Sequence, residues 1–113
     1  MQIEESTYAG TPLITVHGDV DHYSFAELAG PVHALLDQRV TRLALDLREC
    51  PYMDSAGVAI LLNALGRMQP LGGFLAVITV NPELRRTFQI VGLTGFESFR
   101  VLSSPDELAV LSV

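Results

Sequence analysis

Short apolar stretches alternate along this chain with segments in which apolar residues recur at helical spacing. The apolar stretches predict strands, at 3–8, 13–16, 43–47, 74–80 and, as a short edge strand, 97–102. The helical spacing predicts helices, over 25–36, 55–68, 82–91 and from Pro105 onward. Pro31 interrupts the first of these, so we expect a kink there or a helix in two pieces.

The order of these elements predicts an α/β fold. Strands that alternate with helices indicate right-handed crossovers and parallel strands. The first two strands are separated only by 9–12 and are predicted to form an antiparallel hairpin. The expected sheet is therefore small and mixed, with about four to five strands. In the helix over 55–68 the apolar positions follow one predicted buried stripe, namely Val58, Leu61, Leu62, Leu65 and Met68.

The predicted helix starts differ in their capping signals. Ser24 and Ser104 each stand three residues before a Glu, which predicts capping boxes, and Asn81 precedes a Pro. The helix that starts at Ser55 has neither signal, and Gly57 in its first turn costs up to ~1 kcal/mol. This weak start indicates another purpose for Ser55, and Gly57 is expected to leave the nearby backbone open to another protein.

Length, charge and cysteine content restrict the class of protein. The 113 residues predict a single domain over 1–113, and 49% apolar residues argue against disorder. A lone Cys50, no signal-peptide pattern and no membrane-length apolar run favour a cytoplasmic location. A net charge of −6 with no basic stripe argues against nucleic acid and anionic membranes as partners.

The sequence lacks the residues that several kinds of catalytic and phosphate-binding site require. All seven basic residues are Arg, so a P-loop and a Schiff-base enzyme are excluded, and Asp54 lacks the Lys that phospho-aspartate receivers use. No Gly-x-Ser-x-Gly elbow is present, and all three His, at 17, 22 and 33, precede Ser55 with spacings that suggest no metal site. Cys50 is predicted to be a small apolar filler, and no catalytic residue, metal or cofactor is expected.

Two polar segments, 18–22 and 52–57, each follow a predicted strand. If those strands are neighbours, their carboxyl ends share one sheet edge, and Asp19 and Asp21 converge with Asp54 and Ser55. The Ser55 hydroxyl then lies beside unpaired N–H groups that favour a phosphate. An N-cap role explains Ser55 equally well. The simpler interpretations of the two acids are that Asp19 forms a turn and that Asp21 is a solvated loop residue.

Tyr52 and Met53 are expected to be partly buried anchors of the Ser55 loop, although either can also face a partner.

The segments 18–22 and 52–58, with Asp46-Leu47 between them, resemble the STAS domain of bacterial anti-sigma factor antagonists. The match continues in order through 72–73, 81–82, 85–86 and 92–93, and covers nearly the whole chain. It departs at Asp19, where Glu is commoner, at Cys50, where an aliphatic residue is usual, and at Pro31. It implies a small mixed sheet with helices mainly on one face.

The resemblance also implies a phosphorylation-switched binding module. In that family an ATP-dependent kinase, which is also the anti-sigma factor, phosphorylates the serine at the Ser55 position, beside the acid at the Asp21 position. The unmodified protein would sequester the anti-sigma factor, phosphate would release it, and a serine phosphatase would reset the switch. The residues expected to contact the partner are Asp19, Asp21, His22, Tyr52, Met53, Asp54, Ser55, Ala56 and Gly57.

Two other interpretations remain. One is a STAS subunit of another assembly, such as a lipid-transport ATPase complex or a stress-signalling scaffold. The other, less favoured, is an enzyme that uses Ser55 as a nucleophile. The sequence leaves open whether the chain forms a homodimer and whether it binds a nucleotide.

Overall fold

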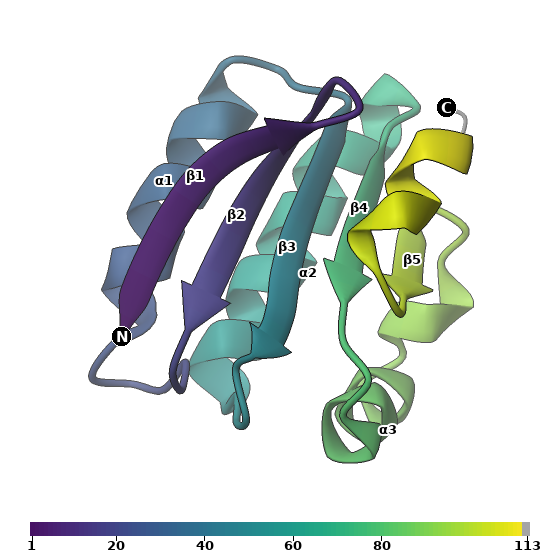
Figure 1. Cartoon of the computed structure of the whole chain (residues 1–113). Coiled ribbons are helices and arrows are strands. Elements are labelled where there is room, and N and C mark those ends of the chain that lie inside the picture. The colour runs from purple at the N-terminus through teal and green to yellow at the C-terminus, as the bar shows by residue number, and fades with distance from the viewer. Residues whose placement is uncertain (112–113) are drawn as a thin grey trace.

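A five-stranded mixed sheet organises the computed structural model, which describes residues 1–111 (Figure 1). The strands are β1 (Gln2–Tyr8), β2 (Thr11–His17), β3 (Arg42–Glu49), β4 (Phe74–Ile78) and β5 (Phe99–Leu102). The helices are α1 (Phe25–Asp37), α2 (Ser55–Met68) and α3 (Pro82–Ile90), with 3₁₀ turns η1 (Gln69–Leu71), η2 (Leu93–Gly95) and η3 (Pro105–Val110). Within the sheet the strands lie in chain order; β1 is antiparallel to β2, and all other pairs are parallel. The predicted α/β class and mixed sheet are confirmed.

The hairpin between β1 and β2 turns over two residues, fewer than the sequence pattern predicted. Ala9 and Gly10 have φ values of 50° and 79°, and Tyr8 pairs with Thr11 across them. Two successive left-handed residues are typical of the type I′ turn, whose twist matches that of the flanking strands. Thr11 and Pro12 therefore belong to β2.

The helices cover mainly one face of the sheet (Figure 1). On that face the large core combines inward residues of β2, β3 and β4 with the buried faces of α1, α2 and α3. The opposite face has a smaller core, which includes Phe74, Ile78 and Leu102 and is covered by Leu108 of η3. The last predicted helix is thus a 3₁₀ segment, and it packs on the face that the α-helices leave open.

The start of α1 departs from its prediction. Ser24 forms no capping box: its Oγ donates to the carbonyl of Asp19 at 2.8 Å, and Asp21 Oδ1 accepts the N–H groups of Tyr23 and Ser24 at 2.9 and 3.0 Å. The helix also continues unbroken past Pro31. The β2–α1 loop, rather than a local capping box, therefore holds the first turn of α1.

The other predicted caps form. At η3 the N–H of Ser104 donates to Glu107 Oε2 at 3.2 Å, which completes a capping box. At α3 the side chain of Asn81 accepts the N–H of Glu83 at 2.9 Å, and Pro82 occupies the first turn. Local sequence signals were sufficient at these two starts because both partners lie within three residues.

His17, at the end of β2, lies between two carboxylates of neighbouring strands. Its Nδ1 contacts Glu49, and its Nε2 is 3.5 Å from Glu4 Oε2, an ion-pair distance rather than a hydrogen bond. Glu4 and then Glu49 raise the pKa of His17 above its ordinary value, although partial burial opposes the shift. The protonated imidazole therefore ties β1, β2 and β3 together at the edge where the two polar loops begin.

A pH-dependent contribution to stability follows from this pair of contacts. Because the folded pKa is raised, the contribution is complete below the unfolded pKa of about 6.5 and is lost as pH rises through the folded pKa. We expect His17→Gln to lower the urea midpoint more at about pH 5.5 than at about pH 8.5. His33→Gln, at an exposed site on α1, is the control. Equal losses for His17→Gln at both pH values would contradict the assignment.

Candidate functional site

The loops that follow β2 and β3 are joined into one surface. The N–H of Gly18 donates to the Glu49 carbonyl at 2.9 Å, and the N–H of Val20 donates to the Tyr52 carbonyl at 3.0 Å. The N–H of Asp54 returns to the Val20 carbonyl at 3.0 Å. Because β2 and β3 are parallel neighbours, both loops leave the sheet at one edge, as the sequence argument required.

Asp54, and not Ser55, is the N-cap of α2. Its Oδ1 accepts the N–H groups of Ala56 at 2.8 Å and Gly57 at 3.4 Å. Its Oδ2 accepts the N–H of His22 at 3.0 Å and lies 3.5 Å from His22 Nδ1. The prediction that α2 has a weak start was therefore wrong: one carboxylate both caps the helix and binds the neighbouring loop.

The electrostatics of Asp54 agree with this double role. Partial burial disfavours its ionised form, but hydrogen bonds from three backbone N–H groups outweigh that effect and lower the pKa below the ordinary value. The pKa of Asp21 is also lowered. The N–H of Tyr23 has the largest effect, and the N–H and hydroxyl of Ser24 stabilise the carboxylate further. Both acids are therefore charged at neutral pH, on the two sides of the joined loops.

Removal of the Asp54 carboxylate is expected to destabilise the fold at neutral pH. The contribution is present above the unfolded pKa of about 3.9 and is lost as pH falls through the lowered folded pKa. Asp54→Ala should therefore lower the urea midpoint clearly at about pH 7 and much less at about pH 3. Asp19→Ala, in the exposed part of the other loop, should change little. A loss for Asp54→Ala that stays the same at both pH values would contradict the capping role.

Ser55 is the first residue of α2, and its side chain is exposed. Among residues 1–111 no hydrogen bond engages its hydroxyl, since Asp54 satisfies the nearby N–H groups. Asp21 turns its carboxylate into its own loop, toward Tyr23 and Ser24, while Asp19 is exposed. The hydroxyl is thus available to another molecule without loss of a cap.

Two residues expected to face a partner are buried. Met53 is 4% exposed, and Gly57 is also buried. A Cβ built on Gly57 would lie 2.9 Å from Val20 Cγ1 and closer still to Met53 Cγ. Gly57 therefore allows the helix to pack against the joined loops and does not open the backbone to a partner. Met53 and Gly57 can only position the surface from beneath.

The other residues of the predicted surface reach solvent. Tyr52 is 53% exposed, His22 is exposed and its ring lies 4.0 Å from that of Tyr23, and Ala56 is partly exposed. Cys50 is buried, its Sγ donates to the Tyr52 carbonyl at 3.3 Å, and burial raises its pKa. The prediction that Cys50 is a small apolar filler is confirmed.

A groove between α2 and α3, which sequence reasoning missed, begins at Ser55. It has a volume of about 330 Å³ and is mostly apolar; its lining residues are Met53, Asp54, Ser55, Val58, Ala59, Leu62, Thr87 and Val91. Leu62, predicted to be part of the buried stripe, is instead 44% exposed on the groove wall. The side chain of Asn81 donates to the Pro51 carbonyl at 3.2 Å and fixes the start of α3 against the loop.

Two negative findings concern the described part of the chain. Over residues 1–111 no helix is long and apolar enough to span a bilayer. Over the same residues no group of three His, Cys, Asp or Glu side chains is arranged to hold a metal ion.

Comparison with known proteins identifies the family. Residues 4–103 match the family model described as "Mlab, STAS domain". The chain belongs to the STAS domain family. The anti-sigma F factor antagonist of Paenibacillus polymyxa is 28% identical to this STAS domain over 98 residues, which cover 82% of this chain and 80% of that protein. The anti-sigma-B factor antagonist of Bacillus subtilis is 29% identical over 80 residues, which cover 71% of this chain and 72% of that protein.

Solved structures share the fold of this STAS domain. Unphosphorylated SpoIIAA, an anti-sigma factor antagonist, superposes with a TM-score of 0.72 at 22% identity, covering 96% of this chain and 93% of its own. The phosphorylated form of SpoIIAA superposes with a TM-score of 0.73 at 19% identity, covering 95% of this chain and 96% of its own. A putative anti-sigma factor antagonist from Thermotoga maritima superposes with a TM-score of 0.83 at 15% identity, covering 94% of this chain and 90% of its own.

Proposed function

We propose that this STAS domain is an anti-sigma factor antagonist that is switched by phosphorylation of Ser55. The observation that carries the proposal is the exposed Ser55 hydroxyl at the first position of α2, with its capping work done by Asp54. The names of two relatives support it, because the similar proteins of Paenibacillus polymyxa and Bacillus subtilis are anti-sigma factor antagonists. The unmodified surface would bind an anti-sigma factor with serine kinase activity and hold it away from its sigma factor.

Phosphate at Ser55 would change the charge of the surface and leave the core untouched. It adds about −1.5 to −2 charge beside Asp54 and near Asp21. Asp54 already uses the N–H groups of Ala56 and Gly57, so α2 offers the phosphate little compensation. A partner that packs against Ser55 would have to bury this charge unpaired, which disfavours the complex.

The groove between α2 and α3 extends the proposed contact surface. Val58, Leu62 and Val91 provide apolar lining in the groove that begins at Ser55. The exposed loop residues Tyr52 and His22 lie on the joined loops. Apolar contact in the groove would supply affinity, while Ser55 at its end would control access.

The STAS domain would itself carry out no chemical step. The kinase would transfer the γ-phosphoryl group of ATP to Ser55 Oγ, so that the Oγ–P bond forms, the bond to ADP breaks, and a base of the kinase accepts the hydroxyl proton. A serine phosphatase would direct water at phosphorus, so that the Oγ–P bond breaks, inorganic phosphate leaves and Ser55 Oγ regains its proton.

Phosphorylation itself tests the proposal. Incubation with ATP and the anti-sigma factor kinase of the same organism should add one phosphate, detected by intact mass and located at Ser55 by peptide mapping. Ser55→Ala should abolish the gain, and Ser103→Ala, at an exposed serine of the β5–η3 connection, should keep it. A phosphate that persists in Ser55→Ala, or the absence of any gain, would refute the switch.

The alternative, a STAS subunit of another assembly, makes a different prediction. Purification of the tagged protein from its own host should recover a small kinase if it is an anti-sigma factor antagonist. Recovery of a transport ATPase or a scaffold complex without a kinase would support the alternative.

A further inference from the structure

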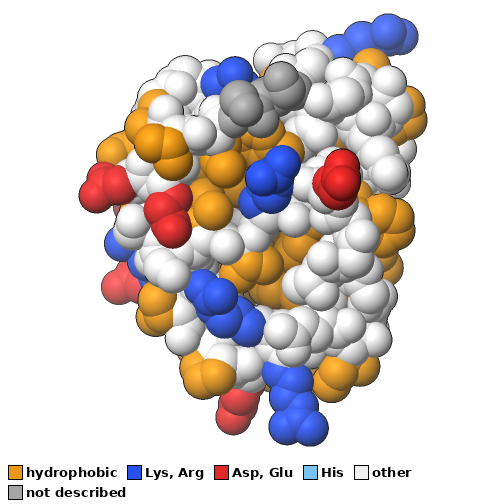
Figure 2. Space-filling view, turned by 90° about the vertical axis from the view of Figure 1, so that its right-hand side faces the viewer, with side chains coloured by type: hydrophobic (Ala, Val, Ile, Leu, Met, Phe, Trp, Pro, Cys, Tyr) orange, Lys and Arg blue, Asp and Glu red, His pale blue; other side chains and the backbone are white. Residues whose placement is uncertain are grey.

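The joined loops contain a single basic side chain, that of His22. Over residues 18–24 and 50–54 the carboxylates are those of Asp19, Asp21 and Asp54, and no Arg occurs. Figure 2 shows that Arg side chains reach the surface elsewhere, on the side of the molecule turned toward β5. A phosphate on Ser55 would therefore enter a surface that offers it three carboxylates and one imidazole.

His22 lies at the start of α2, although it belongs to the loop that follows β2. Its backbone N–H donates to Asp54 Oδ2 at 3.0 Å, and its ring Nδ1 lies 3.5 Å from the same oxygen. The ring packs against that of Tyr23, with centroids 4.0 Å apart, and the side chain is 68% exposed. The backbone is thus fixed beside the helix start, while the exposed ring is free to change its partner.

The side chain of Ser55 occupies the same end of the helix. Ser55 directly follows Asp54, and the Cα–Cβ bonds of an α-helix tilt toward its N-terminus. The N–H groups of Ala56 and Gly57, which a helix start would otherwise offer to a phosphate, already bind Asp54. A phosphoryl group on Ser55 therefore needs another donor, and the ring that contacts the preceding residue is the nearest basic group of the joined loops.

Two carboxylates face the His22 ring in the unmodified protein. Partial burial opposes ionisation of Asp54, but backbone N–H groups and then the His22 ring lower its pKa. For Asp21 the N–H of Tyr23 is the main cause of the lowered pKa, and the His22 ring contributes further. Because both carboxylates keep their backbone donors, they lose little if the ring turns toward a phosphate that carries more charge.

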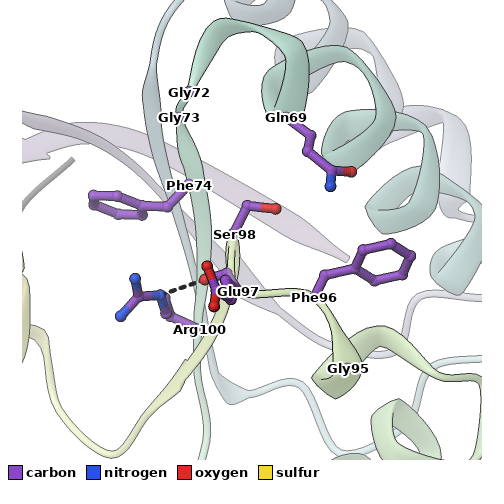
Figure 3. A pocket seen from close by; sticks show the side chains of 9 residues that line it. All are labelled: Gln69, Gly72, Gly73, Phe74, Gly95, Phe96, Glu97, Ser98 and Arg100. Atoms are coloured by element: carbon purple, nitrogen blue, oxygen red, sulfur yellow. Dashed lines mark hydrogen bonds between the residues drawn. The ribbon is translucent and has the colours of Figure 1, made fainter.

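Two exposed Arg side chains outside the loops are directed away from the start of α2. Arg100 lines a hollow of about 490 Å³ at the far end of α2, about 20 Å along the helix axis. Its Nε donates to the Glu97 carbonyl at 2.6 Å, and Figure 3 shows the guanidinium on the opposite side of the strands from Phe96. On α3, Arg86 lies about 100° around the helix from Thr87, which lines the groove between α2 and α3.

From this geometry we propose that His22 is the phosphate-binding residue of the switch, and that its imidazolium leaves Asp54 to pair with phosphate on Ser55. The inference rests on the proposed function, because it concerns the same phosphate. Phosphoserine has a second pKa of about 6 and histidine titrates at about 6.5, so each charged form stabilises the other near neutral pH. One imidazolium offsets only part of the phosphate charge of about −1.5 to −2, so a partner still meets an acidic surface.

Phosphoserine incorporated at position 55 during translation tests the pairing without a kinase. The ³¹P chemical shift, followed against pH, gives the titration midpoint of the phosphate. With His22 present the midpoint should lie about 0.5 pH units or more below that of His22→Gln, because a nearby imidazolium favours the dianion. His22→Gln keeps the backbone N–H that Asp54 accepts, and His22→Arg should restore the low midpoint. Equal midpoints with His22 and with His22→Gln would overturn the proposal.

Two matched controls and a second signal separate pairing from general electrostatics. Arg86→Gln and His33→Gln, at exposed residues of α3 and α1, should keep the low midpoint. Long-range ¹H–¹⁵N spectra should show the ring nitrogens of His22 shifting on phosphorylation, while those of His33 stay in place. Unchanged His22 ring signals, or a midpoint that responds to Arg86→Gln instead, would also overturn it.

The two proposals fail in different ways. Failure of the kinase to modify Ser55 would refute the proposed function, whereas the incorporated phosphoserine would still report the pairing with His22. Conversely, a phosphate that the kinase adds to Ser55, with a midpoint unaffected by His22→Gln, would support the switch and refute only the role of His22.

Discussion

Ser55→Asp is expected to weaken the complex with the anti-sigma factor by about 100-fold or more, whereas Ser55→Ala should bind like the wild type. The reason is that a charge at the first position of α2 would be buried against the partner beside the carboxylate of Asp54, which already occupies the helix N-terminus. An unpaired charge in an interface costs about 2–5 kcal/mol, the range that a 100-fold change requires. Isothermal titration of the purified pair measures it directly.

The matched control for charge is Ser103→Asp. It places the same group on an exposed residue of the β5–η3 connection, which follows β5 and belongs to neither of the joined loops. Its affinity should stay within about threefold of the wild type, because exposed charges outside an interface contribute little. Equal affinities for the wild type, Ser55→Ala and Ser55→Asp would end the switch hypothesis, even if Ser55 were phosphorylated.

Gly57→Ala is expected to destabilise the protein by about 1–3 kcal/mol, the cost of overpacking a filled core. The added Cβ would overlap Met53 and lie 2.9 Å from Val20 Cγ1, at the junction that holds the two loops together. Met53 is buried, so its side chain has little room to move away. Urea unfolding, followed by circular dichroism, measures the loss.

Gly66→Ala is the control, because it lies on the same helix and has no neighbour within 4 Å of its Cβ position. Here the substitution should stabilise by up to about 1 kcal/mol, through the better helix propensity of Ala. Opposite signs for Gly57→Ala and Gly66→Ala are therefore expected. Stabilisation by both would show that Gly57 is not needed for packing beneath the loops.

Most elements could be predicted from the sequence because their signals are local. The run at 43–47 is apolar with a single acid, as befits a strand buried on both faces, and the parallel pairing of β2 with β3 followed from the intervening helix. The caps at Asn81 and Ser104 formed as predicted, since each depends on residues within one turn. Ser55 was correctly placed at the start of α2.

The expectations that were wrong depended on contacts outside the helix concerned. Ser24 lost its predicted capping box because its hydroxyl bonds to the Asp19 carbonyl. Leu62 fits the helical stripe, but α3 leaves its side of α2 partly uncovered, so it lines a groove. Spacing along the chain specifies which residues share a helix face, but it does not specify how far the next element covers that face.

By itself the sequence determined the mixed sheet, the edge at which the polar loops meet and the position of Ser55 at a helix start. Only the tertiary structure decided that Asp54 caps α2 and binds His22, that Gly57 packs inward and that Ser55 is left with a free hydroxyl. The physical reason is distance along the chain: His22 and Asp54 are 32 residues apart, and only the parallel pairing of β2 and β3 brings them into hydrogen-bond contact. Which side chain caps the helix, and which remains available, follows from that long-range contact.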